Sequence, residues 1–193
     1  MFNCLAMIPV IQGAGLLKYP LGVCSLASVF IIFERAYGLR RSAVMPSDLV
    51  DAVIQGRPLM GGKHTVLARI VEFAELHAND EGGIKAFARL EVNKMSRGVP
   101  YLDVIYAVAP LLGLMGTVSG LLEVFSQITP ESGGMPDPAV FTKGVALALS
   151  ATLLGLGIAI PSLLGAGYLS RKIENYAAEL EVLLERIIRR AKS

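Results

Sequence analysis

Apolar residues dominate three long stretches of the chain, and charged residues are concentrated between and after these stretches. The stretches cover residues 16–35, 100–128 and 143–170. Each is long enough to cross a bilayer as a helix, which takes about 20 residues. The pattern therefore predicts an all-α membrane protein with three transmembrane helices.

The first connection, residues 36–99, mixes charged and apolar positions and is predicted to form a soluble helical loop. Within it, residues 66–77 and 83–97 have the apolar period of amphipathic helices. An earlier helix is expected to have the side chain of Ser47 or Asp48 at its N-cap. The loop is therefore predicted to be a helical region in its own right.

Residues 171–193 follow the third span without a helix breaker, so the third helix is predicted to extend well into the cytoplasm. This tail carries an apolar stripe, which we expect to pack against the same helix in other copies of the chain. The stripe consists of Ile173, Tyr176, Leu180, Leu184 and Ile187. Lysine and arginine are frequent in this tail and in residues 36–99, and absent from residues 129–142. The positive-inside bias therefore places the loop and the tail in the cytoplasm, with an interfacial segment at residues 1–15 and a hairpin at 129–142 on the periplasmic side.

Composition narrows the class of protein. The chain is 53% hydrophobic, its mean hydropathy is +0.57 and its formal net charge is +2, so it fits neither an ordinary soluble domain nor a nucleic-acid-binding protein. His64 and His77 lie far apart, and the sequence has no metal-ligand, redox or phosphate-loop motif, so no cofactor and no metal is expected. Cys4 and Cys24 are the only cysteines, and they do not make a disulfide framework.

The second and third spans each carry a stripe of small residues with one threonine near its middle. The members recur at spacings of three and four, so each set lies on one face of its helix. On the second span they are Ala109, Gly113, Gly116, Thr117 and Gly120, and on the third they are Ala148, Ala151, Thr152, Gly155 and Ala159. Small residues let membrane helices approach closely, so the stripes are expected to be packing faces.

The two threonines lie at similar depth. At about 1.5 Å per residue, Thr117 is about 16 Å and Thr152 about 14 Å from the outer end of its span. Two facing hydroxyls can hold a water or bond a carboxylic acid. Alternatively, each hydroxyl bonds only the carbonyl four residues before it, and the residues alone leave both interpretations open.

The segments APLLGLMGTVSGL and ALSATLLGLGIAIP, in that order, resemble the paired signature of the MotA/TolQ/ExbB proton-channel family, most closely its ExbB/TolQ branch. The segment YPLGVCSLASVFIIFERAYGLRR is similar to the family's first transmembrane helix, which ends in a Glu-Arg pair followed by basic residues. Three spans with an outward N-terminus is also the topology of this branch, whereas a MotA-type protein has four.

The resemblance implies a proton-channel or stator subunit of a bacterial inner-membrane complex, which couples the proton-motive force to TonB-dependent uptake or a Tol-Pal type process. In the family, threonines at the positions of Thr117 and Thr152 line a pore formed by five copies. The pore surrounds the single transmembrane helix of an ExbD/TolR-like partner, whose aspartate carries the proton. A TonB- or TolA-like protein is a further partner, and membrane lipid surrounds the homopentamer.

Glu123 is the one carboxylate well inside a span, about 9 Å outward of Thr117. It is either a proton entry group near the outer surface or an interfacial carboxylate with no role in transport. The third span of the family often carries a glutamate within GIAEAL, but this chain has GVALAL, with Leu147 in its place. No role of that glutamate can therefore be carried over.

A rival function of a different class is a membrane scaffold that assembles like the family and conducts nothing. Proton flux measured with a reconstituted partner separates the two functions. An intramembrane enzyme is not expected, because rhomboid-like proteolysis needs serine and histidine inside the membrane and both histidines here lie in the loop.

Overall fold

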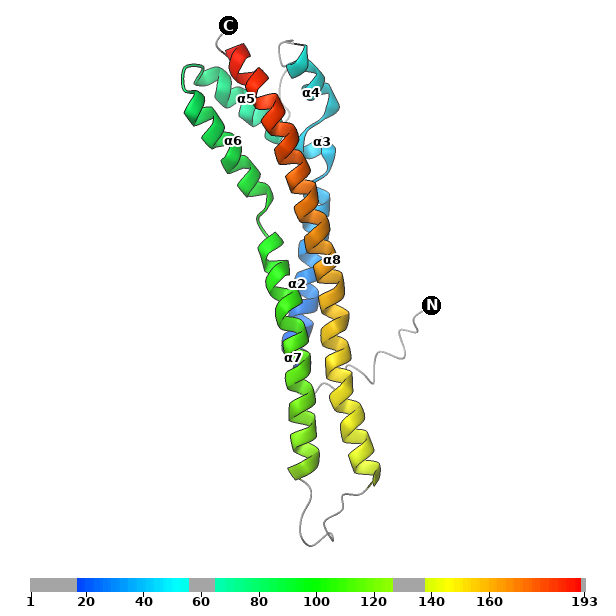
Figure 1. The fold of residues 1–193 in the computed structure, drawn as a ribbon. Helices are drawn as coiled ribbons and strands as arrows, with labels where there is room; N and C mark the ends of the chain where they lie inside the picture. The colour runs from blue at the N-terminus through cyan, green and yellow to red at the C-terminus, as the bar shows by residue number, and fades with distance from the viewer. Residues whose placement is uncertain (1–16, 56–64, 127–137, 192–193) are drawn as a thin grey trace. The chain divides into compact units, whose positions relative to one another are not determined.

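The computed structural model describes residues 17–55, 65–126 and 138–191 of the 193-residue chain, and these residues form helices joined by short turns (Figure 1). No strand occurs within these three ranges. The interfacial segment predicted at residues 1–15 lies outside the described residues, as does most of the hairpin predicted at 129–142. So do Cys4 and His64.

Three helices are long and apolar enough to cross a membrane: α2 (Lys18–Gly38), α7 (Val99–Ser126) and α8 (Pro138–Ala191). The predicted all-α membrane fold is confirmed. Helix α8 continues far beyond its apolar stretch as one helix of 54 residues. Both later helices contain a proline, Pro110 in α7 and Pro161 in α8, and both continue through it, as membrane helices can when neighbouring groups satisfy the freed carbonyl.

One compact unit combines the described parts of Met1–Ile31 and Tyr101–Gly165. In this unit α7 and α8 run antiparallel and side by side (Figure 1), as the contacts described below require. Helix α2 packs on them through Leu21, which forms a small buried cluster with Ala109 of α7 and Ala159 of α8.

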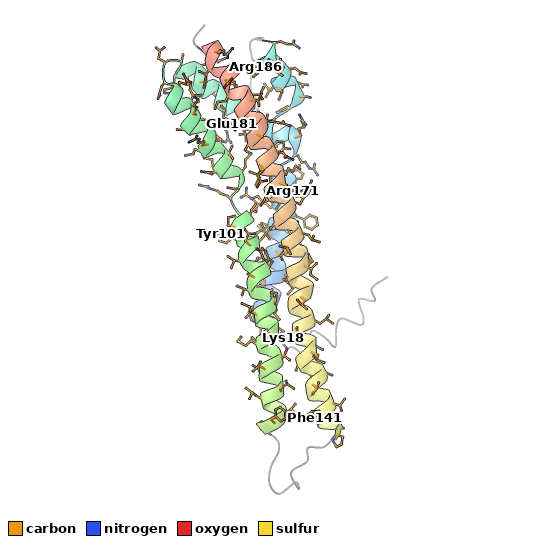
Figure 2. The ribbon with its side chains drawn as sticks, viewed as in Figure 1. Lys18, Tyr101, Phe141, Arg171, Glu181 and Arg186 are labelled. Atoms are coloured by element: carbon orange, nitrogen blue, oxygen red, sulfur yellow. The ribbon has the colours of Figure 1, made fainter. Side chains whose placement is uncertain are left out.

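Large apolar side chains cover the outward faces of this unit (Figure 2). Exposed examples are Val23, Leu26, Phe30, Leu111, Leu114, Val118, Leu149, Leu153 and Leu156. Lipid tails are as apolar as these side chains, so such a unit needs little internal apolar burial. What holds the helices together must instead be close packing and hydrogen bonds.

The second compact unit combines Ile32–Pro100 with the described part of Ala166–Ser193. Besides the ends of the long helices it contains α3 (Arg41–Val44), α4 (Ser47–Ile54), α5 (Val66–Leu76) and α6 (Glu81–Met95). Helices α5 and α6 pack against each other, and side-chain caps fix where they begin. Thr65 accepts from the backbone N–H of Ala68, and Asp80 accepts from that of Gly83.

The structure corrects two details of the loop. Neither Ser47 nor Asp48 caps α4; Pro46 occupies the N-cap position, and its carbonyl accepts from Leu49 and Val50. The helix starts one residue early because the Pro46 carbonyl already accepts the first hydrogen bonds, and its φ of −59° and ψ of 138° are the extended values usual for an N-cap. Helix α6 starts at Glu81 instead of the expected residue 83, because the Asp80 side chain satisfies a free N–H of its first turn.

The apolar stripe of the tail is buried within its own chain, so the expectation that it packs against other copies was wrong. Four of its five members, Ile173, Tyr176, Leu180 and Ile187, are buried and Leu184 is half-buried; the neighbouring Leu183 and Ile188 are buried as well. The same unit also contains the loop helices α3 to α6. The tail of α8 is therefore the core of its unit.

Candidate functional site

The backbones of α7 and α8 approach so closely that only glycine fits at two positions. A Cβ atom on Gly155 would lie 2.6 Å from the carbonyl oxygen of Ala109. A Cβ on Gly113 would lie 2.9 Å from the carbonyl oxygen of Ala151 and 3.0 Å from Cα of Thr152. Because these contacts are with backbone atoms, no side-chain movement could relieve them.

The two small-residue stripes continue this contact along the helices. A Cβ on Gly116 would lie 2.5 Å from Cβ of Ala151, and one on Gly120 would lie 3.0 Å from Cβ of Ala148. The stripes therefore face each other within one chain. This placement leaves the larger side chains of both helices on the outside.

Thr117 and Thr152 meet in the middle of this contact. Their hydroxyl oxygens are 2.5 Å apart, and both side chains are half-buried. Thr117 lies one turn after Gly113, and Thr152 lies beside the same glycine, so the close approach at Gly113 is what brings the hydroxyls together. A larger residue at that position would separate them.

The hydrogens of this threonine pair can be counted. Each hydroxyl has one hydrogen, and one of the two must join the oxygens. If Thr117 donates to Thr152, then Thr152 donates to the Gly113 carbonyl at 3.2 Å. If Thr152 donates to Thr117, then Thr117 donates to the carbonyl of Gly113 at 3.3 Å or of Ala148 at 3.4 Å. The threonine pair thus has two hydrogen arrangements on one set of heavy-atom positions.

In both arrangements the two hydrogens are used and a lone pair stays free for an incoming donor. The threonine pair can therefore accept a hydrogen bond from a protonated carboxylic acid without rearranging. Thr117 reaches the carbonyl four residues before it, as the alternative interpretation expects, but Thr152 reaches across to the opposite helix. Hydroxyl bonding within each helix alone thus does not describe this site.

Glu123 lies apart from the threonine pair. It is exposed on α7, and the residue after it, Val124, packs where a Cβ on Gly144 would lie 2.0 Å from Cγ2 of that valine. Leu147 is 37% exposed on α8, so the position of the family glutamate faces outward in the single chain. Within the part of the chain that the structure describes, the threonine pair has no carboxylate partner of its own.

Two buried polar contacts are not predicted by the sequence pattern. Ser28 and Ser162 form a hydrogen bond at 2.6 Å between α2 and α8, and both side chains are almost fully buried. Glu91 is 1% exposed on α6 and is bound by Arg69 of α5 and by Lys94. For Ser28 and Ser162 the signal in the sequence is a serine within an apolar span, and such serines are too common to indicate a contact.

The described residues contain no group of three histidine, cysteine, aspartate or glutamate side chains that could hold a metal ion. The candidate chemistry therefore belongs to the hydroxyls and to whatever group approaches them. Fold and site together define a helical membrane protein in which two antiparallel membrane-spanning helices enclose a hydroxyl pair.

Comparison with known sequences agrees with this class. Residues 77–182 match the MotA/TolQ/ExbB proton channel family, and because this is more than half of the chain, the chain belongs to that family. The resemblance inferred from the two small-residue segments is confirmed. The protein is thus a membrane subunit of the energy-transducing type that this family comprises.

Individual relatives match different shares of the chain. It is 29% identical over 189 residues to the biopolymer transport protein exbB1 of Vibrio cholerae serotype O1, an alignment that covers 88% of this chain and 82% of the relative. It is 29% identical over 136 residues to the biopolymer transport protein ExbB of Aquifex aeolicus, covering 70% of this chain and 90% of the relative. The biopolymer transport protein ExbB of Salmonella typhimurium is 40% identical over 86 residues, covering 45% of this chain and 34% of the relative.

Proposed function

We propose that this chain is the channel-forming subunit of an inner-membrane complex that uses the proton-motive force to do work on the cell envelope. The observation that carries the proposal is the hydrogen-bonded pair of Thr117 and Thr152 at the contact between α7 and α8. Moving one proton across 100 mV releases about 2.3 kcal/mol. The complex would convert this free energy into movement of a partner protein.

The proton carrier in this proposal is an aspartate on the single transmembrane helix of an ExbD/TolR-like partner. When protonated, that aspartate donates a hydrogen bond to the threonine pair. When ionised, it needs donors, and a threonine can supply one by giving up its bond to the Gly113 carbonyl. The threonine pair therefore favours a carboxyl group in either state and guides its proton, while storing none itself.

Five copies arranged around the partner helix would place the threonine pairs around a common axis. Family membership supports this homopentamer. Native mass spectrometry of the detergent-extracted protein should then give a pentamer; a stable monomer or dimer, with or without the partner, would contradict it. Glu123 is proposed as an exposed group near one end of the path, with a secondary role.

The proposed orientation places the N-terminus in the periplasm and the second unit in the cytoplasm. Support comes from the basic residues of Ile32–Pro100 and of the tail of α8, which the positive-inside bias assigns to the cytoplasm. The test is to replace Cys4 and Cys24 by serine, introduce single cysteines at Ser126 and at Ser96, and label them with a reagent that does not cross the membrane. Ser126 should react from outside in intact cells and Ser96 should not.

Replacement of the threonines by valine tests the mechanism, because valine keeps the shape and removes the hydroxyl. Thr152→Val should leave assembly intact and abolish partner-dependent proton flux, with a weaker loss for Thr117→Val and partial recovery for serine at either position. Ser150→Ala is the matched control, because Ser150 is two residues away and its hydroxyl donates to the carbonyl of Ala146 in its own helix.

The outcomes separate the proposal from its rival. If the double valine variant assembles with the partner and conducts at the wild-type rate, the hydroxyls serve packing alone and the proton path runs elsewhere. If the wild-type complex assembles and conducts nothing, the chain is a scaffold. Whether the work is TonB-dependent uptake or of the Tol-Pal type depends on the partner, and co-purification of a TonB-like or a TolA-like protein decides it.

A further inference from the structure

Basic residues gather where α2 and α8 leave their apolar stretches. Residues 19–33 and 144–170 contain no charge, and charged residues begin directly after each. Within residues 34–41 and 168–179 there are five cations and three carboxylates. The cations are Arg35, Arg40, Arg41, Arg171 and Lys172. Both segments belong to the second unit, so they can be considered together.

Two contacts hold these segments side by side. The hydroxyl of Tyr176 donates to the carbonyl of Leu39 at 3.0 Å, and Arg41 lies 3.6 Å from the carboxylate of Glu179. Leu39 and Arg41 follow the end of α2, and Tyr176 and Glu179 lie on α8. The earlier residue of one segment contacts the earlier residue of the other, so the two segments run in the same direction. The apolar stretches therefore end on the same side of this unit.

Two of the cations fold back over exposed tyrosine rings. The guanidinium carbon of Arg40 lies 4.2 Å from the ring centroid of Tyr37, and the ammonium nitrogen of Lys172 lies 5.6 Å from that of Tyr168. The rings themselves are 68% and 61% exposed. In each case the tyrosine precedes the cation, so the cation reaches back along the chain toward the apolar stretch.

Tyrosine prefers the boundary between lipid tails and headgroups, and a cation on its ring is attracted by the π electrons without losing its capacity to bind an anion. Arg35 takes no part in this arrangement, because its Nε is buried without a hydrogen-bond acceptor among the described residues and its guanidinium lies 3.9 Å from the carboxylate of Glu34. Guanidinium groups bind phosphate oxygens through two parallel N–H donors.

We propose that Arg40 on Tyr37 and Lys172 on Tyr168 form a surface that binds the phosphate headgroups of anionic phospholipids. Five cations against three carboxylates give residues 34–41 and 168–179 a positive excess, and the continuity with uncharged spans places the surface at headgroup level. A soluble phosphate could use the same donors, but it would gain nothing from the exposed rings. The ligand is therefore the lipid.

Native mass spectrometry of the full chain, released from nanodiscs that contain phosphatidylglycerol and phosphatidylcholine in equal amounts, tests the proposal. The wild type should retain phosphatidylglycerol preferentially. In the double variant Arg40→Gln/Lys172→Gln, the preference for phosphatidylglycerol should fall by a factor of about five for each cation removed. Preference unchanged in the double variant would overturn the proposal.

The matched control removes the same charge away from the tyrosines. Arg89 of α6 and Arg186 of α8, the latter labelled with Arg171 in Figure 2, are exposed and lie over no tyrosine ring in the part of the chain that the structure describes. Arg89→Gln/Arg186→Gln should keep the preference. An equal loss in this control would mean that net charge alone attracts the lipid, and the surface would then not exist as a site.

Two further arms identify the role of the rings and the source of the phosphate. Tyr37→Phe/Tyr168→Phe should retain the preference and Tyr37→Leu/Tyr168→Leu should weaken it, because phenylalanine keeps the aromatic face. Equal binding by the leucine variant would contradict the seating of the cations on the rings. Excess glycerol phosphate should not displace the lipid; displacement would assign the donors to a soluble phosphate and overturn the proposal.

Discussion

The hydroxyls of Ser28 and Ser162 lie 2.6 Å apart at the contact between α2 and α8, with exposed fractions of 3% and 0%. Ser162 gives its hydrogen to the carbonyl of Ile158 at 2.7 Å, so Ser28 is the donor between the two serines. Replacing Ser162 by alanine leaves the Ser28 hydroxyl buried without this acceptor.

We expect Ser162→Ala to destabilise the protein by about 1 kcal/mol in thermal unfolding in detergent. The double variant Ser28→Ala/Ser162→Ala should lose less than the sum of the single variants, because it removes both partners. Additive losses in this double-mutant cycle would show that the hydrogen bond contributes nothing.

Gly113 and Gly157 give a matched pair of alanine substitutions in one membrane unit. A Cβ on Gly113 would lie 2.9 Å from a backbone oxygen, whereas one on Gly157 would have nothing within 4 Å. Gly113→Ala should push α7 and α8 apart and weaken assembly, while Gly157→Ala should be neutral or stabilise its helix by up to about 1 kcal/mol. Equal melting temperatures of the two variants would contradict the close approach.

Tyr176 connects the tail of α8 to the end of α2. Burial raises the pKa of its phenol above the usual 10.0, so the hydroxyl stays protonated and keeps donating to Leu39 at neutral pH. Because the folded-state pKa lies above the unfolded one, the associated stability is complete below about pH 10 and declines as the pH rises through the folded-state pKa.

Tyr176→Phe should cost about 1 kcal/mol at neutral pH and reduce the loss of stability at alkaline pH. Tyr168→Phe is the control, because that ring is 61% exposed and should show neither effect. Denaturant unfolding of both variants at neutral and alkaline pH is the measurement, and the same alkaline loss in Tyr176→Phe as in the wild type would refute the assignment.

The buried Glu91 should contribute more to the stability of the helical loop than the exposed glutamates of this loop. It is 1% exposed and bound by Arg69 and Lys94, whose own side chains are nearly half exposed. Glu91→Gln should therefore cost about 1–3 kcal/mol, limited because both cations can turn to water. Glu72→Gln, on the exposed side of α5, should change the melting temperature little.

Ile187 and Val182 test the finding that the apolar stripe of α8 lies in the core of the second unit. Ile187 is 2% exposed and Val182 is 69% exposed. Ile187→Ala should cost about 2–5 kcal/mol of unfolding free energy, and Val182→Ala less than about 0.5. If Ile187→Ala instead left thermal unfolding unchanged and reduced only the oligomer, the stripe would belong to an interface between copies.

The sequence predicted the helices because their signals are local. Uncharged stretches such as residues 144–170 and the spacing of Gly113 and Gly155 describe single helices and their faces. The partner of each face is not local information. The spacing of the stripe at Leu180 predicts a packing face, but nothing in the tail itself shows that this face is buried within one chain. The Ser28–Ser162 bond joins residues 134 positions apart and follows only from packing.

The contact at Gly113 and Gly155 also limits how this protein can move. A slide of α7 by one turn, about 5.4 Å, would bring Ala109 or Thr117 into the place that Gly113 now occupies. Neither fits, since even a single carbon there would lie within 3 Å of backbone oxygen. The two helices consequently cannot ratchet past each other. Any tilt or rotation in a working cycle must therefore move α7 and α8 together as one rigid pair. Sliding between helices can then occur only at surfaces outside this pair.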